Sequence, residues 1–282
     1  MRLCIFNPEH DLCLAKGRWN YVPPRSAVEF AHRDAELMQV LYPDAVCTSV
    51  YDLDNFNFQL SNFNSVIAWG WDAVVKHELL KRGVGESLLP SDEEINTIRE
   101  LQHRSTVLPL QPDCMEVHSI EEMESLLRER EHWVMKAPWS GAGRGLRWVH
   151  GCLTAIDRDW LAKTVMSQRC VIAEPRREVI ADVALEYMVY GDVRFIGYSY
   201  FRTGSGVYKE NILWPDEKIE STFLLLPIRQ RVECWLADDV VQRYRGPIGV
   251  DLMVDTRGQV FVAEINFRHT MGMVAHAKIN QS

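Results

Sequence analysis

Residues 133–149, WVMKAPWSGAGRGLRWV, constrain the fold of this chain more than any other stretch. Lys136 ends a short apolar run, a loop holds Gly141, Gly143 and Gly145, and a second apolar run follows. A dinucleotide fingerprint or a Walker loop needs its glycines to open a helix, whereas the residues after this loop have the pattern of a strand. In a protein kinase the lysine follows the glycines, and here it precedes them. The stretch therefore predicts two strands joined by a glycine-rich loop.

This arrangement of lysine and glycines suits a phosphate clamp. Glycines allow backbone N–H groups to approach a phosphate closely, and the ammonium of Lys136 on a rigid strand adds a positive charge. A flexible hairpin beside a lysine whose stem covers apolar surface accounts for the same residues. The choice between these two interpretations depends on a second motif.

Residues 246–272 predict a second hairpin, with its turn at 256–258. Apolar and polar residues alternate along both strands, as they do when one face of a strand is buried. If the loop between the two strands contains an even number of residues, their pairing places Asp251 on the same face as Glu264 and Asn266. Two carboxylates and an amide oxygen suit Mg²⁺ or Mn²⁺, whereas zinc fits this set of ligands poorly.

Arg268 follows Asn266 by two residues and carries donors that could hold a transferring phosphoryl group. An ordinary amphipathic hairpin with its polar face in water would show the same alternation, but it does not explain the lysine loop. The two motifs are therefore best considered together.

Together the two motifs resemble those of the ATP-grasp superfamily. In that family, ATP lies between a subdomain with a strand-borne lysine and glycine-rich hairpin and a subdomain that ends in an acidic strand, a turn and a Glu-x-Asn strand. The resemblance implies that the phosphates of ATP contact Lys136, Ser140, Gly141, Ala142, Gly143 and Gly145. It implies that Mg²⁺ (or Mn²⁺) binds to Asp251, Glu264 and Asn266, and that Lys136 and Arg268 are the catalytic residues.

The segment between the two motifs corresponds to the part of the family that meets the adenine. The resemblance implies that Glu174 accepts from the adenine amino group, with backbone partners from Ala173 to Arg176. Asp182 is the candidate for the ribose hydroxyls, with Glu178 as the alternate. Without the flanking motifs, Glu174 would be interpreted as an ordinary glutamate at a strand end before a proline turn.

The chain departs from the family in the region of the second nucleotide lysine. Many members carry that lysine just before a helix, whereas this chain has Arg104, followed by Pro109 and Pro112, which forbid a long helix. Arg104 is therefore a candidate ATP-binding residue, and an exposed surface arginine is the alternative.

The pattern upstream of the motifs indicates a separate domain. Strand and helix patterns alternate over residues 3–81, as in βαβ units, and two capping boxes follow at Ser91 and Ser119. The sequence thus predicts an α/β (α+β) protein, with a small N-terminal Rossmann-like pre-ATP-grasp domain followed by a two-lobed ATP-grasp fold. The expected limits are 1–88 for the first domain and 89–282 for the ATP-grasp domain, divided into a lysine and glycine-loop lobe over 89–165 and an adenine and metal lobe over 166–282.

Substrates other than ATP are expected at the carboxyl ends of the first strands. Ligands of open α/β sheets bind there, so the loops at 7–11 and 69–72 are candidates, although their residues are also ordinary turn formers. Arg202, Tyr208 and Lys209, between two predicted strands, are candidates for contact with the acceptor.

Composition excludes several classes of protein. Apolar residues make up 47% and charged residues 25%, as in ordinary globular proteins, and the net charge of −8 argues against non-specific binding of nucleic acid. Seven cysteines without a CxxC motif indicate reduced thiols, and no apolar run approaches the roughly 20 residues of a membrane span. A cytoplasmic protein is expected.

The resemblance implies an ATP-dependent ligase that converts a small-molecule or peptide carboxylate into an acylphosphate, which an amine or thiol then attacks. An ATP-dependent phosphotransferase would use the same ATP residues. The sequence is also compatible with a non-catalytic nucleotide-binding protein, and with an α/β binding module that takes no nucleotide.

Overall fold

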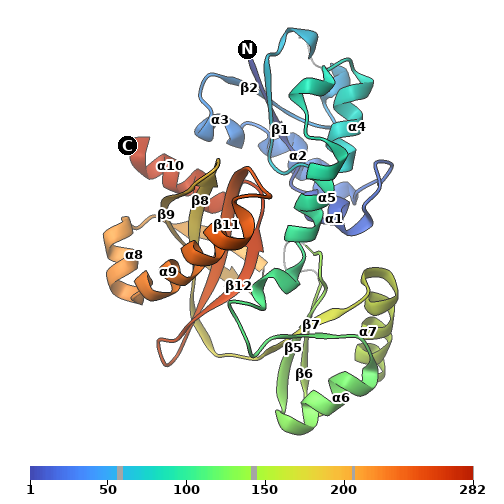
Figure 1. Cartoon of the computed structure of the whole chain (residues 1–282), viewed down its shortest axis with the longest axis vertical. Helices are drawn as coiled ribbons and strands as arrows, with labels where there is room; N and C mark the ends of the chain where they lie inside the picture. Colours follow the sequence, from blue (N-terminus) through green and yellow to red (C-terminus); the bar gives the residue numbers. More distant parts are fainter. Residues whose placement is uncertain (56–59, 141–144, 205–206, 282) are drawn as a thin grey trace.

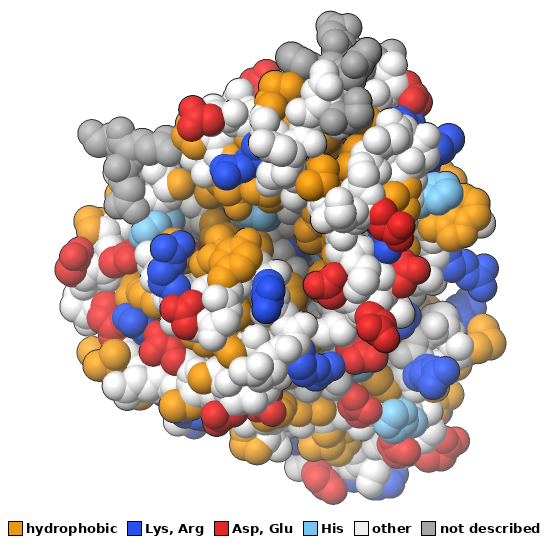
Figure 2. All heavy atoms as spheres, turned by 45° about the horizontal axis from the view of Figure 1, so that its top comes forward, with side chains coloured by type: hydrophobic (Ala, Val, Ile, Leu, Met, Phe, Trp, Pro, Cys, Tyr) orange, Lys and Arg blue, Asp and Glu red, His pale blue; other side chains and the backbone are white. Residues whose placement is uncertain are grey.

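The computed structural model describes residues 1–55, 60–140, 145–204 and 207–281. Its strands form three sheets of three, four and five strands, and helices flank each sheet (Figure 1). No helix in these ranges combines the length and apolar character that a bilayer span requires. On the face shown in Figure 2, acidic and basic side chains are interspersed over the described surface.

The N-terminal part of the chain forms the three-stranded sheet, which is parallel with the order β2-β1-β3. Its strands are β1 (Arg2–Phe6), β2 (Ala45–Ser49) and β3 (Ser65–Ala68). Its helices are α1 (His10–Lys16), α2 (Arg25–Asp34), α3 (Leu37–Leu41), α4 (Ala73–Lys81) and α5 (Asp92–Leu101), with short 3-10 turns at Leu53–Asn55, Leu60–Asn62, Glu86–Leu88 and η4 (Arg104–Val107). The expected βαβ alternation is confirmed. Parallel strands need such crossover connections, and the centre of β1 is fully buried.

Side-chain caps define two helix starts that the sequence predicts. Asp72 accepts from the backbone N–H groups of Val74 and Val75 at the start of α4. Ser91 and Glu94 form the complete capping box of α5. At Ser119 only half of the predicted box forms, because the carboxylate of Glu122 accepts from His118.

The four-stranded sheet carries the lysine hairpin and has the order β4-β7-β5-β6. Its strands are β4 (Met115–Val117), β5 (His132–Lys136), β6 (Leu146–His150) and β7 (Val171–Pro175), flanked by α6 (Ile120–Glu129) and α7 (Ala155–Gln168). The predicted strand–loop–strand arrangement is confirmed, since β5 and β6 pair antiparallel. Residues 171–175, which the sequence assigns to the second lobe, instead pair with β4 and β5 in this sheet, and their side chains are buried.

The five-stranded antiparallel sheet carries the acidic hairpin and has the order β10-β9-β8-β11-β12. Its strands are β8 (Val179–Val189), β9 (Val193–Gly204), β10 (Val207–Ile212), β11 (Gly246–Asp255) and β12 (Val260–Asn266). Its helices are α8 (Asp216–Phe223), α9 (Leu226–Trp235) with a π-helical turn at Leu236–Val240, and α10 (Met271–Gln281). Leu185, Tyr187 and Val250 on one face pack with Val232 and Leu236 in the largest core cluster. The opposite face carries the polar residues of the site.

Candidate active site

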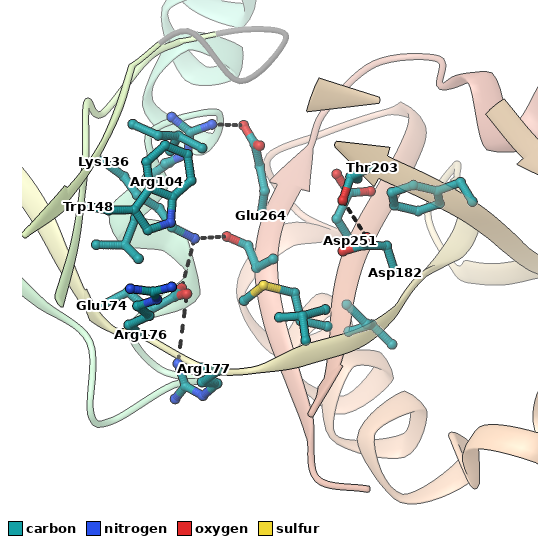
Figure 3. A pocket seen from close by; sticks show the side chains of 17 residues that line it. Arg104, Lys136, Trp148, Glu174, Arg176, Arg177, Asp182, Thr203, Asp251 and Glu264 are labelled. Carbon is teal, nitrogen blue, oxygen red and sulfur yellow. Dashed lines mark hydrogen bonds and ion pairs between the residues drawn. The ribbon is translucent and has the colours of Figure 1, made fainter. Parts of the chain in front are cut away.

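A pocket of about 570 Å³ lies between the four-stranded and five-stranded sheets. That volume lies within the range of small-molecule sites, about 300–1,000 Å³. Lys136 and Trp148 line it from the smaller sheet, and Asp182, Asp251 and Glu264 line it from the larger sheet (Figure 3). Both predicted motifs therefore contribute side chains to one cavity. Its apolar lining includes Val134, Leu146, Val179, Phe201, Leu252 and Met253.

Lys136 forms an ion pair with Glu174 inside this pocket. The ammonium Nζ donates to Glu174 Oε2 at 2.8 Å and to the carbonyl oxygen of Ala263 at 3.4 Å. Both side chains are buried, and Arg177 lies 3.8 Å from the other carboxylate oxygen of Glu174. Two residues that the resemblance assigns to different parts of ATP thus contact each other directly (Figure 3).

Most of the backbone of β7 pairs with the neighbouring strands β4 and β5. Ala173 lies in the centre of the strand, opposite Met115 on one side and Met135 on the other. The N–H of Arg176 donates to the carbonyl of His132 at 3.2 Å, while the side chain of Arg176 lines the pocket. The backbone contacts expected for adenine therefore compete with hydrogen bonds inside the protein.

Arg104 is buried, with 6% of its surface exposed, so it is not the exposed surface arginine of the alternative interpretation. Its guanidinium donates to the carbonyl of Ala137 at 2.7 Å, to Ser140 Oγ at 2.5 Å and to Glu264 Oε1 at 2.9 Å. The turn η4 that carries it has only four residues, as the prolines after it require. Arg104 thus ties the start of the glycine loop to the acidic strand.

The glycine loop is described only at its two ends. Gly141, Ala142 and Gly143 lie outside the described residues. At Gly145 a side chain would not fit, because a Cβ there would lie 2.5 Å from Cβ of Ser140. The carbonyl of Gly145 accepts from the N–H of Ala137 at 2.8 Å, which closes the base of the loop.

The predicted metal ligands come together on β11 and β12. Asp251 lies directly opposite Glu264, and Asn266 Nδ2 donates to Asp251 Oδ2 at 3.1 Å. Burial, with the neighbouring carboxylates of Glu264 and Glu186, raises the pKa of Asp251 to about 8. A divalent cation would reverse that effect by favouring the ionised form. Two carboxylates and an amide oxygen fit Mg²⁺ or Mn²⁺.

Arg268 lies beside this cluster, facing helix α1, and is not among the residues that line the pocket. It donates to Asp11 Oδ2 at 3.0 Å and to Asn266 Oδ1 at 2.8 Å. Although burial alone would raise it, the guanidinium of Arg268 lowers the pKa of Asp11. The amide oxygen expected to bind metal thus already accepts from Arg268, which links Asp11 of α1 to Asp251 through Asn266.

The two N-terminal loops predicted to bind a substrate meet at the carboxyl ends of β1 and β3. Asn7 Nδ2 donates to the carbonyl of Gly70 at 2.8 Å and to Asp72 Oδ2 at 2.9 Å, and His10 Nδ1 lies 3.3 Å from the same oxygen. Burial raises the pKa of the neighbouring Glu9 to about 7. Glu9 Oε2 has no hydrogen-bond partner among the described residues.

The remaining candidates are placed differently. Asp182 lines the pocket and accepts from Thr203 Oγ1 at 2.7 Å, and burial raises its pKa. Glu178, Arg202 and Lys209 are exposed, and none of these three lines the pocket. The side chain of Tyr208 lies outside the described residues.

Among the pocket side chains that carry a polar group, the motifs do not identify three. They are Trp148, Arg177 and Thr203, of which Arg177 and Thr203 belong to no recognisable pattern. Alternation along the second strand of the lysine hairpin places Trp148 on the same face as Leu146, and this was the one signal that pointed to it. The sequence places Asp11 only in a loop, because its partner Arg268 is 257 residues away.

No family model and no curated protein matches the sequence. In structure, the chain is similar to D-alanine–D-alanine ligase from Bacillus anthracis, with a TM-score of 0.55, 12% identity, and 100% of this chain and 95% of that protein covered. For a D-cycloserine synthetase the TM-score is 0.55 at 13% identity, and the match covers 99% of this chain and 98% of that protein. For biotin carboxylase from Campylobacter jejuni the TM-score is 0.58 at 12% identity, and the match covers 98% of this chain and 67% of that protein. At such identities the likeness establishes the fold alone, and this chain has the fold of the ATP-grasp superfamily.

Proposed function

We propose that this protein is an ATP- and Mg²⁺-dependent ligase that activates a carboxylate as an acylphosphate and joins it to an amine or a thiol. The observation that carries the proposal is that Lys136 and the carboxylates of Asp251 and Glu264 line one pocket from opposite sheets. The structural similarity of the chain to a ligase, a synthetase and a carboxylase supports a ligase reaction. The predicted boundary at 88 belongs to this proposal, whereas the boundary predicted at 165 moves to the end of β7, because α7 continues to Gln168 and β7 pairs with β5.

In this proposal the pocket residues divide between the base, the sugar and the phosphates. The apolar lining holds the adenine beside Glu174, and Asp182 with Thr203 holds the ribose. Lys136, Arg104 and the glycine loop bind the phosphates. Asp251, Glu264 and Asn266 would hold Mg²⁺, which when bound neutralises charge on the phosphates. The chain's contribution is positioning and electrostatic complementarity, which dominate catalysis of phosphoryl transfer.

The reaction has two steps. A carboxylate oxygen of the substrate attacks the γ-phosphorus, the bond to the β–γ bridging oxygen breaks, and ADP leaves. The amine or thiol then attacks the acyl carbon, the carbon–oxygen bond to phosphate breaks, and the nucleophile loses its proton to solvent. Arg268 positions Asn266 in this scheme, and the contact with the phosphoryl group that the resemblance implies stays a prediction.

One observation favours a second candidate, a nucleotide-binding protein without catalysis. The cations Lys136 and Arg104 are already paired, with Glu174 at 2.8 Å and with Glu264 at 2.9 Å. A nucleotide would have to displace or share these contacts. The presence of both Asp251 and Glu264 favours the ligase.

The test is ADP release in the presence of pooled carboxylates and hydroxylamine, which traps an acylphosphate as a hydroxamate. The ligase predicts ADP and hydroxamate that both depend on the carboxylate and disappear in Glu264→Gln. A phosphorylated product without hydroxamate would identify a phosphotransferase. Binding of ATP without ADP release under every condition would contradict catalysis.

A further inference from the structure

A second group of possible metal ligands lies at the open end of the β5–β6 hairpin. Glu131, His132 and His150 each offer one donor atom, and these atoms lie within 4.8 Å of one another. His132 and His150 are directly opposite across the two strands. Their rings are stacked with centroids 4.2 Å apart, and their Nδ1 atoms are 3.0 Å apart.

Taken two at a time, donor atoms of these residues lie near the spacing of a zinc site, and one set of three lies within 4.8 Å. Zinc binds imidazole nitrogen and carboxylate oxygen at about 2.0–2.2 Å, so tetrahedral ligands lie about 3.4 Å from each other. His150 Nε2 is 3.5 Å from Glu131 Oε1, and His132 Nε2 is 3.9 Å from Glu131 Oε2. All three side chains are exposed, so no neighbouring side chain encloses them in their present rotamers.

We propose that Glu131, His132 and His150 bind Zn²⁺ through two imidazole nitrogens and one carboxylate oxygen, with the remaining position open. This ligand set differs from the oxygen ligands of Asp251, Glu264 and Asn266, which suit a hard cation. The same contact could be a hydrogen bond between two neutral imidazoles. Binding of metal separates these two interpretations.

The position of the site connects it to the proposed nucleotide pocket. Side chains alternate along a strand, so His132 shares a face with Val134 and Lys136, and His150 shares a face with Trp148. Those three neighbours line the pocket. Lys136 is four residues from His132, roughly 13 Å along the strand. Zn²⁺ bound here cross-links the two strands of the hairpin at the end remote from Lys136.

The test is titration of the full chain with Zn²⁺ without nucleotide, by calorimetry and by competition with a chromogenic chelator. We expect saturable binding of one ion, weakened about tenfold or more in His150→Ala and in His132→Ala. His118→Ala is the matched control, because His118 is an exposed histidine beside Glu116 outside the cluster. It should bind Zn²⁺ as the parent protein does.

Exposed thiols are the main competing ligands, so Cys152→Ser with Cys234→Ser is tested in parallel. Binding that survives this change and is lost in His150→Ala assigns the ion to the hairpin. Co²⁺ provides a second readout, because tetrahedral nitrogen and oxygen ligation gives a visible spectrum that the histidine variants should lose. The proposal is overturned if the parent protein does not bind Zn²⁺, or if both histidine variants bind as it does.

Discussion

At the scale of single residues, the ion pair between Lys136 and Glu174 changes what a mutation of the lysine measures. From the sequence, a lysine that only clamps phosphate should be removable without loss of stability in the absence of ATP. The buried carboxylate of Glu174 lies 2.8 Å from the ammonium. Removing one partner of a buried pair leaves an uncompensated charge, which costs about 3–5 kcal/mol. Loss of stability therefore cannot by itself identify a structural lysine.

The double variant Lys136→Met with Glu174→Gln removes this complication. We expect Lys136→Met alone to lower the free energy of unfolding by about 3–5 kcal/mol and the double variant to recover most of that loss. Both should bind ATP about 10- to 150-fold more weakly, since a hydrogen bond to a charged group contributes about 1.5–3 kcal/mol. Denaturant unfolding and ATP titration of both proteins are the measurements. Parent-like affinity in the double variant would show that Lys136 is structural.

Glu9 should make stability depend on pH. Burial raises its pKa to about 7 from the ordinary 4.5, so the folded protein holds this proton more tightly than the unfolded chain does. Its contribution to stability is complete below pH 4.5 and is lost as the pH rises through about 7. Glu9→Gln keeps the neutral form at every pH. Relative to the parent, this variant should become more stable between about pH 5 and pH 8, by up to about 3 kcal/mol. A difference in unfolding free energy that stays constant over this range would contradict the assignment.

At the scale of elements, the acidic hairpin was predictable and its details were not. Alternation along each strand is local information, so the sequence predicts both strands and places Asp251 with Glu264. The structure adds a bulge, in which Ala263 has no residue opposite it and directs its carbonyl to Lys136. Bulges depend on how neighbouring strands twist and pack, which no short pattern records. The assignment of β7 to the smaller sheet likewise depends on pairing with a distant strand.

Glu264→Gln tests the hairpin as a metal-binding element. The change keeps an acceptor for Arg104 but removes the charge beside Asp251, so Mg²⁺ should bind more weakly. We expect turnover to fall at least about 100-fold, as when a preorganised electrostatic group is lost, with a smaller change in ATP affinity. Glu210→Gln is the matched control, because Glu210 is an exposed carboxylate paired with Arg202 in the same sheet. If Glu264→Gln and Glu210→Gln both turned over as fast as the parent protein, the acidic face would be only a protein surface.

At the scale of the whole molecule, the sequence could identify most chemically important residues but not their partners. Arg104 meets Glu264 across 160 residues, and Arg268 meets Asp11 across 257. Motifs describe neighbours in sequence, whereas these contacts depend on how the turn η4 and the N-terminal part of the chain pack against the five-stranded sheet. For the same reason the exposed candidates Arg202 and Lys209 could not be separated in advance from the residues that line the pocket.

The measurement that tests the central claim most directly is calorimetric titration of the folded protein with ATP in excess Mg²⁺. The account predicts one site per chain, with a Kd between about 1 µM and 1 mM, the usual range of enzyme–substrate affinity. Saturation at about 100 times Kd should also stabilise the fold by roughly 2.7 kcal/mol. Omission of Mg²⁺ should weaken binding, and so should the double variant at Lys136 and Glu174. A folded sample that neither binds Mg²⁺ATP at millimolar concentration nor gains stability from it would contradict the account.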